Sequence, residues 1–337
     1  MILLVQAAPI KAPQIFSTFS RHYFMLIHDS FATVRPARFA GSCYPANEQK
    51  LSDLLDSVVV LPHHLTLSGE SVRKSAQAII APHIDFRVGL SAYGPAYYAL
   101  LDSDADVFVV LATSHYGWGS LFIPTFQHFA TPHGVVKTDH ELLQKLYEKL
   151  PHLTRDDSAH HEEHSIEFEV VFLQRFFGSR DFSILPILIT SFYPLIQSYK
   201  NGMILPTANA DFIRFCEALR ETLAASGKKV AFVASGDMAH IGRKFDDPYD
   251  AATMLKTVEE EDKHLLHAME TSNTSEYFQR IAAVGDAYKI CGLPPVYTTL
   301  ELAGCSDGSS LAYEQWHERS TRSAVTYSSL AYYGMMF

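Results

Sequence analysis

The sequence Val107-Phe108-Val109-Val110-Leu111, which runs on to Thr113-Ser114-His115, decides the fold class. An unbroken run of β-favouring apolar residues predicts a strand that is buried on both faces, as in a parallel sheet covered by helices. Residues 78–81 and 230–234 are two further short apolar runs of this kind. The chain is therefore predicted to contain a buried sheet that includes these three strands.

Helical patterns alternate with the strands. Ile166, Val170, Leu173 and Phe177 are spaced at i, i+4, i+7 and i+11, which predicts an amphipathic helix over residues 164–177. The same reading predicts helices at 91–101, 141–150, 211–225, 251–269 and 276–284, and strands at 182–189, 324–327 and 330–333. Pro186 predicts an edge position or a bulge for its strand. Together these elements predict an α/β layered domain with a central mixed β-sheet flanked by helices.

Composition and charge argue against several classes of partner. The 27 basic and 37 acidic residues give a net charge of −10, so neither nucleic acid nor an anionic membrane surface is an expected partner. No segment approaches the ~20 apolar residues needed to span a bilayer. The four cysteines form no Cys-x-x-Cys pair, which favours a reducing compartment and a cytoplasmic location. They are Cys43, Cys216, Cys291 and Cys305.

The first residues differ from the rest of the chain. Their apolar pieces follow no sustained period and show neither the basic start nor the cleavage pattern of a signal peptide. We expect residues 1–34 to form an N-terminal extension, or to reflect a misassigned start codon, and residues 1–30 to contribute little to the core. Residues 35–337 are expected to form a single domain.

Three predicted strands are followed by histidines. His83 follows strand 78–81, His115 follows strand 107–111, and Asp237 and His240 follow strand 230–234. Ligands of open α/β sheets bind beyond the carboxyl ends of the strands. One such histidine is more often a core-edge residue, but three at equivalent positions favour a shared site, where we expect them to converge. Asp237 is also a candidate helix N-cap.

The densest ionisable cluster is His160-His161-Glu162-Glu163-His164. We interpret the first three residues as the solvated start of a helix. Glu163 and His164 are stronger candidates for the site, because the residues that follow them belong to the core. The spacing is not His-Glu-x-x-His, so the cluster gives no support to a zincin-type protease.

Taken together, these motifs resemble the Memo family, whose bacterial and archaeal members are known as AmmeMemoRadiSam system protein B. The resemblance covers residues 35–337 and includes the opening at residues 35–45. The motifs that carry it are, in order, Ala81-Pro82-His83, Ser114-His115, Glu163-His164-Ser165-Ile166-Glu167, Ser235-Gly236-Asp237 with His240-Ile241-Gly242, and Cys291-Gly292 with Pro295.

The resemblance implies a fold similar to class III (LigB-type) extradiol dioxygenases, which are non-haem iron enzymes. It also implies that His83, His115 and Cys291 are metal ligands and that His240 is the neighbouring acid or base. Because a thiolate is a soft ligand, the metal is expected to be iron(II) or copper, with zinc as an alternative.

Further residues are expected to act beside these ligands. Asp237, Glu163 and His164 are expected to orient ligands or take part in catalysis. Family members commonly continue Ala-Pro-His with Ala-Gly-Tyr, whereas this chain has Ile84-Asp85-Phe86. Asp85 is either a turn former or a carboxylate that orients the His83 ring.

The function implied is a metal-dependent oxidoreductase with redox or oxygen-related chemistry at iron or copper. Two alternatives remain open at this point: a non-enzymatic module that binds a peptide or protein, and a metal-dependent hydrolase in which His240 and Asp237 activate water. The resemblance also implies AMMECR1-like and radical-SAM proteins as partners, and an unidentified small molecule or peptide as ligand. Cys216 and Cys305, which lie in no motif, are expected to be away from the site.

Overall fold

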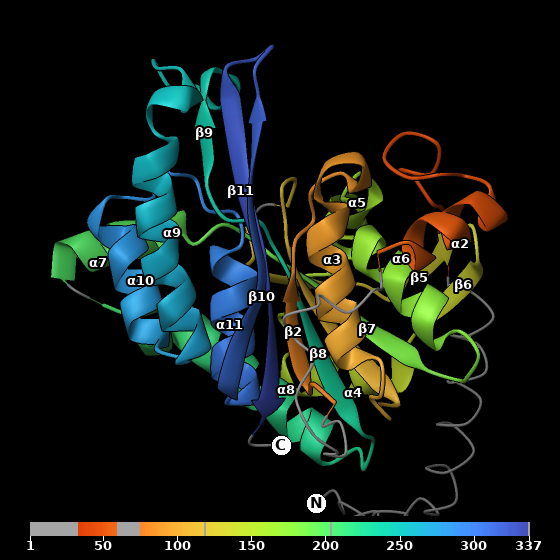
Figure 1. Cartoon of the computed structure of the whole chain (residues 1–337). Helices are drawn as coiled ribbons and strands as arrows, with labels where there is room; N and C mark the ends of the chain where they lie inside the picture. The colour runs from red at the N-terminus through yellow and green to blue at the C-terminus, as the bar shows by residue number, and fades with distance from the viewer. Residues whose placement is uncertain (1–32, 59–74, 118, 203, 336–337) are drawn as a thin grey trace, which may run out of the picture. The chain divides into compact units, whose positions relative to one another are not determined.

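The computed structural model describes residues 33–58, 75–117, 119–202 and 204–335, and in this part of the chain eleven strands form one mixed sheet (Figure 1). Its order is β1-β5-β6-β7-β3-β8-β2-β11-β10, with β4 paired to β7 and β9 paired to β11. The strands are β1 (Val34–Arg35), β2 (Ala78–Ala81), β3 (Val107–Thr113), β4 (Phe122–Pro124), β5 (His128–Thr131), β6 (Gly134–Thr138), β7 (Ser183–Ile189), β8 (Val230–Ser235), β9 (His240–Gly242), β10 (Ser306–Glu318) and β11 (Ser323–Gly334).

The central strands explain why the fold is layered. β7, β3, β8 and β2 are parallel neighbours. Along β3, Val107, Val109 and Leu111 pack into the core on one face of the sheet, while Phe108 and Val110 pack into the core on the other. This strand therefore needs helices on both faces, as its unbroken apolar sequence predicts.

Helices cover both faces of the sheet (Figure 1). One core is closed by α2 (Glu48–Asp56), α3 (Phe86–Leu100) and α6 (Ser165–Phe177). The other is closed by α4 (His140–Lys149), α7 (Tyr193–Gly202), α8 (Ala210–Ala224), α9 (Leu255–Glu270), α10 (Thr274–Ala283) and α11 (Leu293–Ala303). A short helix, α5 (Asp157–His161), precedes α6. The predicted α/β sheet flanked by helices is confirmed.

Two predictions about strands differ from the structure. Pro186 does not place β7 at an edge: β7 pairs along its length with β3, and on its other side with β6 and then β4. Pro186 lies where the partner changes from β6 to β4, a point at which no ladder hydrogen bond needs its missing N–H. Residues 324–327 and 330–333 are not two strands but parts of one, β11, which pairs with β10.

Two helix starts also differ. The predicted helix 91–101 begins earlier, at Phe86, where the Asp85 side chain accepts a hydrogen bond from the Arg87 N–H and caps α3. Asp237 caps no helix, because β8 is followed by an extended loop and then by β9.

The prediction for residues 1–30 lies outside the described part of the chain. Within that part, no helix is long and apolar enough to cross a membrane.

Candidate metal centre

The site begins at the aligned ends of β2, β3 and β8. Ala81 and Ala112 are both register partners of Ser235, so the three parallel strands stop at the same level of the sheet. His83 and His115 follow within three residues of these positions, and Asp237 follows Ser235 by two. Strand pairing therefore brings together motifs that are far apart in the sequence.

Three imidazole rings form the centre of this cluster. The ring centroids of His83 and His115 are 5.1 Å apart, and those of His83 and His164 are also 5.1 Å apart. His115 and His164 stack with an interplanar angle of 15° at 5.0 Å. His164 is thus as close to His83 as the predicted ligand His115 is.

Cys291 is brought to the cluster by a contact between two glycines. A Cβ atom on Gly236 would lie 2.4 Å from Cα of Gly292, so the two backbones pass too closely for any side chain. The Gly292 N–H donates a hydrogen bond of 2.8 Å to the Asp237 carbonyl. This packing leaves Cys291 Sγ 3.2 Å from His83 Nε2. The Gly236-Asp237 and Cys291-Gly292 motifs therefore act as one structural unit.

The implied ligands meet the first requirement of a metal site. One ligand atom each from His83, His115 and Cys291 lie within 4.8 Å of one another. Burial lowers the pKa of His83 well below its ordinary value, so its ring is neutral and keeps a nitrogen lone pair for a metal. Burial raises the pKa of the Cys291 thiol, so the sulfur holds its proton unless a cation replaces it.

Glu163 fixes the orientation of His115. Its carboxylate lies 3.0 Å from His115 Nδ1 and accepts hydrogen bonds from the N–H groups of His115, His164 and Ser165 at 2.7, 2.9 and 3.1 Å. Burial alone would favour the neutral acid, but these contacts with His115 lower the pKa of Glu163 to about 2. An ionised Glu163 holds the proton on Nδ1, which leaves Nε2 of His115 as the metal-binding atom.

Asp237 and His240 lie on the side of Cys291. Ligand atoms of Asp237, His240 and Cys291 also lie within 4.8 Å of one another. Asp237 accepts a hydrogen bond of 3.0 Å from the His83 N–H, and burial raises its pKa to about 7. His83, His115 and His240 thus belong to one connected cluster, as predicted; their roles remain predictions.

His240 is arranged as a neutral base. Its Nδ1 lies 3.1 Å from the carbonyl oxygens of Met238 and Lys289, so this nitrogen carries the proton and Nε2 is the basic atom. Burial lowers the pKa of His240 to about 4.

The structure places two predicted residues elsewhere. Asp85, besides capping α3, pairs with the Arg87 guanidinium, and the carboxylate that approaches the His83 ring is Asp237, at 3.8 Å from Nε2. His160 is not solvated: it is buried, its Nε2 lies 2.8 Å from the Ile123 carbonyl, and burial lowers its pKa to about 4.

The prediction that His161 and Glu162 are solvated agrees with the structure. His161 and Glu162 are exposed, and Glu162 pairs with His161 and Arg38. Cys216 and Cys305 are buried in the core between the sheet and α8 to α11.

Two buried groups beneath the site have roles that the sequence did not predict: Ser235, which was noted only as part of a motif, and Glu169. Ser235 Oγ donates a hydrogen bond of 2.7 Å to the Ser165 carbonyl and lies 3.4 Å from His83 Nδ1. Glu169 is buried with its Oε2 2.6 Å from the Tyr97 hydroxyl, and burial raises its pKa to about 8. A signal for Glu169 exists, since it falls on the apolar stripe of the helix predicted over residues 164–177.

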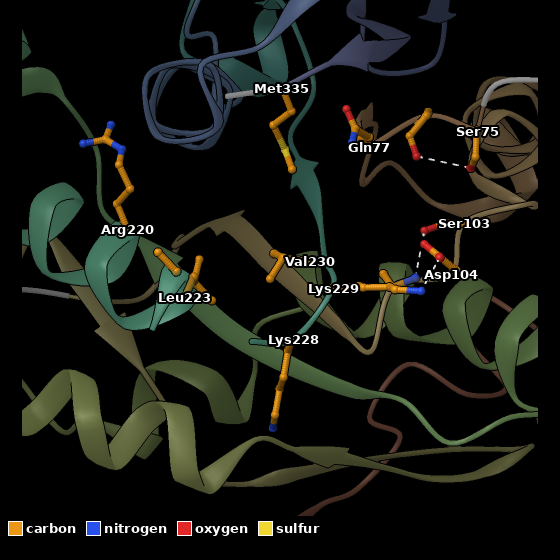
Figure 2. A pocket seen from close by; sticks show the side chains of 13 residues that line it. Ser75, Gln77, Ser103, Asp104, Arg220, Leu223, Lys228, Lys229, Val230 and Met335 are labelled. Carbon is orange, nitrogen blue, oxygen red and sulfur yellow. Dashed lines mark hydrogen bonds and ion pairs between the residues drawn. The ribbon is translucent and has the colours of Figure 1, made fainter. Parts of the chain in front are cut away.

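A cavity of about 700 Å³ lies at the opposite ends of the same strands (Figure 2). It is lined by residues 75–77, 103–105 and 228–229, which precede β2, β3 and β8, and by Val230, the first residue of β8. Its lysines are already paired, Lys228 with Asp139 and Lys229 with Asp104, and Arg220 donates to main-chain carbonyls. We therefore place the functional site at the histidine cluster.

Comparison with known proteins adds a family relationship to this geometry. A sequence profile described as Memo-like protein matches residues 35–331. Two MEMO1 family proteins of Aquifex aeolicus are 27% and 29% identical to this chain, over 89% and 90% of its length and 73% and 99% of theirs. The protein memo-1 homolog of Caenorhabditis elegans is 26% identical over 80% of this chain and 71% of its own length. The profile match spans every residue of the cluster, from His83 to Cys291.

Proposed function

This chain belongs to the Memo-like family, and we propose that it binds one iron or copper ion through His83, His115 and Cys291 for redox or oxygen-related chemistry. The observation that carries the proposal is the mutual approach of the three ligand atoms to within 4.8 Å. Zinc remains an alternative, because two imidazoles and a thiolate also suit it.

The donor set fits a soft or borderline cation. Two neutral imidazole nitrogens and one sulfur favour copper, iron or zinc over magnesium or calcium, which prefer oxygen ligands. The thiol of Cys291 and the ring of His83 face each other at 3.2 Å inside the protein, with the Asp237 carboxyl beside them. Cys291 is a free cysteine, and two imidazoles beside a free thiol support a metal site.

The protein groups around the ligands support proton transfer as well as binding. A bound redox metal would supply electron transfer or activation of an oxygen species. Deprotonation of Cys291 on binding would release one proton to solvent, and the Asp237 carboxyl and the unprotonated Nε2 of His240 are the adjacent groups that would relay it. We propose these two residues as the acid–base pair of the site.

The experiment that tests the proposal is an anaerobic calorimetric titration of the full chain with iron(II), copper(I) and zinc(II). We expect one equivalent of a soft or borderline metal to bind with release of one proton. The proton release is measured as the dependence of the apparent binding enthalpy on the ionisation enthalpy of the buffer. Oxygen consumption by the iron- or copper-loaded protein with a reductant then tests the redox part. A chain that binds none of these metals stoichiometrically would refute the proposal and favour a protein- or peptide-binding module. AMMECR1-like and radical-SAM partners remain a separate proposal from the family resemblance.

A further inference from the structure

We propose that Arg35 and Glu167 are positioning residues of the metal centre, which hold the segment carrying Glu163 and His164 in place. Arg35 lies in β1 and Glu167 in α6, and both are essentially inaccessible, with side-chain exposures of 1% and 0%. Their ion pair measures 2.5 Å from Nη1 to Oε2. The inference rests on the proposed metal-binding function.

The guanidinium of Arg35 binds the backbone on which the site residues sit. Its Nε donates to the His160 carbonyl and its Nη2 donates to the Glu163 carbonyl, both at 2.6 Å. A planar guanidinium makes these bonds at fixed angles, whereas a lysine ammonium is a single point of charge. Arg35 therefore fixes both ends of the turn that leads into α6.

Glu167 binds the segment that follows Arg35 in the sequence. Its carboxylate accepts hydrogen bonds from the N–H groups of Arg38 and Phe39, at 3.1 and 2.9 Å, and from the Tyr44 hydroxyl. The ring of Phe39 in turn meets the His164 ring edge to face, with centroids 5.7 Å apart. Residues 35–44 are thereby fastened to the first turn of α6, directly beside the histidine cluster.

Glu163 carries the connection from Arg35 to the metal ligand. Its carbonyl is held by Arg35, and its carboxylate contacts the backbone N–H and the ring Nδ1 of His115. His115 needs this support, because its side chain is 32% exposed whereas that of His83 is 2% exposed. Loss of the Arg35 bonds would free the Glu163 backbone and, through its carboxylate, the tautomer and orientation of His115.

A buried ion pair is weak evidence of a role in stability. Replacing a buried ion pair by apolar side chains of similar volume is often neutral or stabilising, because the desolvation cost of both charges disappears. A positioning role and a purely structural role therefore make different predictions for an apolar replacement of both partners.

The test uses the double variant Arg35→Met with Glu167→Leu in the full chain and cobalt(II) as the probe. We expect a folded protein that binds cobalt(II) at least about tenfold more weakly than wild type, the range seen when groups that orient a ligand are lost. Nitrogen-15 chemical shifts of the metal-free protein report the tautomer of His115: Nδ1–H in wild type, and a mixture in the variant. The matched control, Asp262→Leu with Tyr313→Phe, removes another polar pair, made by the buried Asp262 and the half-buried Tyr313, whose oxygens are 3.0 Å apart, and should leave both readouts unchanged.

The outcomes separate this inference from the proposed function. Wild type that binds neither cobalt(II) nor any of iron(II), copper(I) and zinc(II) refutes the metal site, while the His115 tautomer still tests the positioning role. Wild-type affinity and an unchanged tautomer in the double variant would overturn the inference. If the double variant does not fold, Arg35→Lys keeps the charge but lacks the planar fork whose three nitrogens contact Glu167 and both carbonyls at once, and the same tenfold loss is expected. Unchanged affinity there would overturn the inference equally.

Discussion

The contact between Gly236 and Gly292 can be tested by adding a single methyl group. In Gly236→Ala the new Cβ would lie 2.4 Å from Cα of Gly292 and 3.2 Å from its nitrogen. Carbon atoms in contact normally stay about 3.5–4.0 Å apart, so the two backbones must separate by roughly 1 Å. Overpacking of this kind costs about 1–3 kcal/mol of stability.

Separating the two backbones would displace one of the proposed metal ligands, Cys291. Gly292 directly follows Cys291, and its N–H donates to the Asp237 carbonyl at 2.8 Å. Moving the two loops apart weakens that bond and withdraws Cys291 Sγ from its position 3.2 Å from His83 Nε2. We expect metal affinity to fall about 10–100-fold, the effect of disturbing the groups that orient a ligand.

The assay combines metal titration with thermal unfolding of the metal-free protein. Gly308→Ala is the matched control, because Gly308 lies in β10, outside the ligand-bearing loops, and its Cβ would lie 2.6 Å from the carbonyl oxygen of Glu270 at the end of α9. The control should lose a similar amount of stability but keep its metal affinity. If Gly236→Ala bound metal as tightly as wild type, the reasoning from the glycine contact would be wrong.

Two further predictions concern buried carboxylates. Glu163→Gln removes the charge that holds the His115 tautomer and should weaken metal binding about 10–100-fold, whereas Glu162→Gln, an exposed neighbour, should not; equal affinities by titration would contradict this. The folded pKa of Glu169, about 8, lies above its unfolded value, so the native state holds a proton that the unfolded state releases and stability falls as pH rises from about 4.5 to 8. Glu169→Gln should flatten this slope. Between pH 5.5 and pH 8, its free energy of unfolding relative to wild type should rise by roughly 2–3 kcal/mol, as measured by chemical denaturation. Parallel pH profiles for variant and wild type would count against it.

Elements with long, regular patterns could be predicted from the sequence. The unbroken apolar run of β3 fits only a strand between two cores. The apolar stripe of α6 fits only a helix with one face against a core. The sequence pattern divides β11 in two because Ser328 and Ser329 resemble a turn. Both serines are in fact buried within the continuous strand. β10 was not predicted because, among the described residues, it pairs only with β11, and every residue except Leu311 is exposed or half-buried, so it has no continuous apolar run.

The site could be predicted only where topology alone decides proximity. The positions of His83 and His115 follow from parallel strands that end at one level. The position of Cys291 depends on a glycine contact between distant loops, and only the family motif pointed to it. The burial of His160 likewise depends on a tertiary contact, with the Ile123 carbonyl, that no local pattern encodes.

The most direct test of the central claim is a comparison of Cys291→Ser with wild type by anaerobic titration of iron(II) and copper(I). Cys216→Ser is the control, because this cysteine is buried in the core, where a hydroxyl should cost stability on the order of 1 kcal/mol without affecting metal binding. If the thiolate of Cys291 is a ligand, Cys291→Ser should keep its fold, lose most of its copper(I) affinity and release less proton on binding. Equal affinities and equal proton release in the two proteins would contradict the ligand assignment and leave the metal, if any, to the histidines and carboxylates.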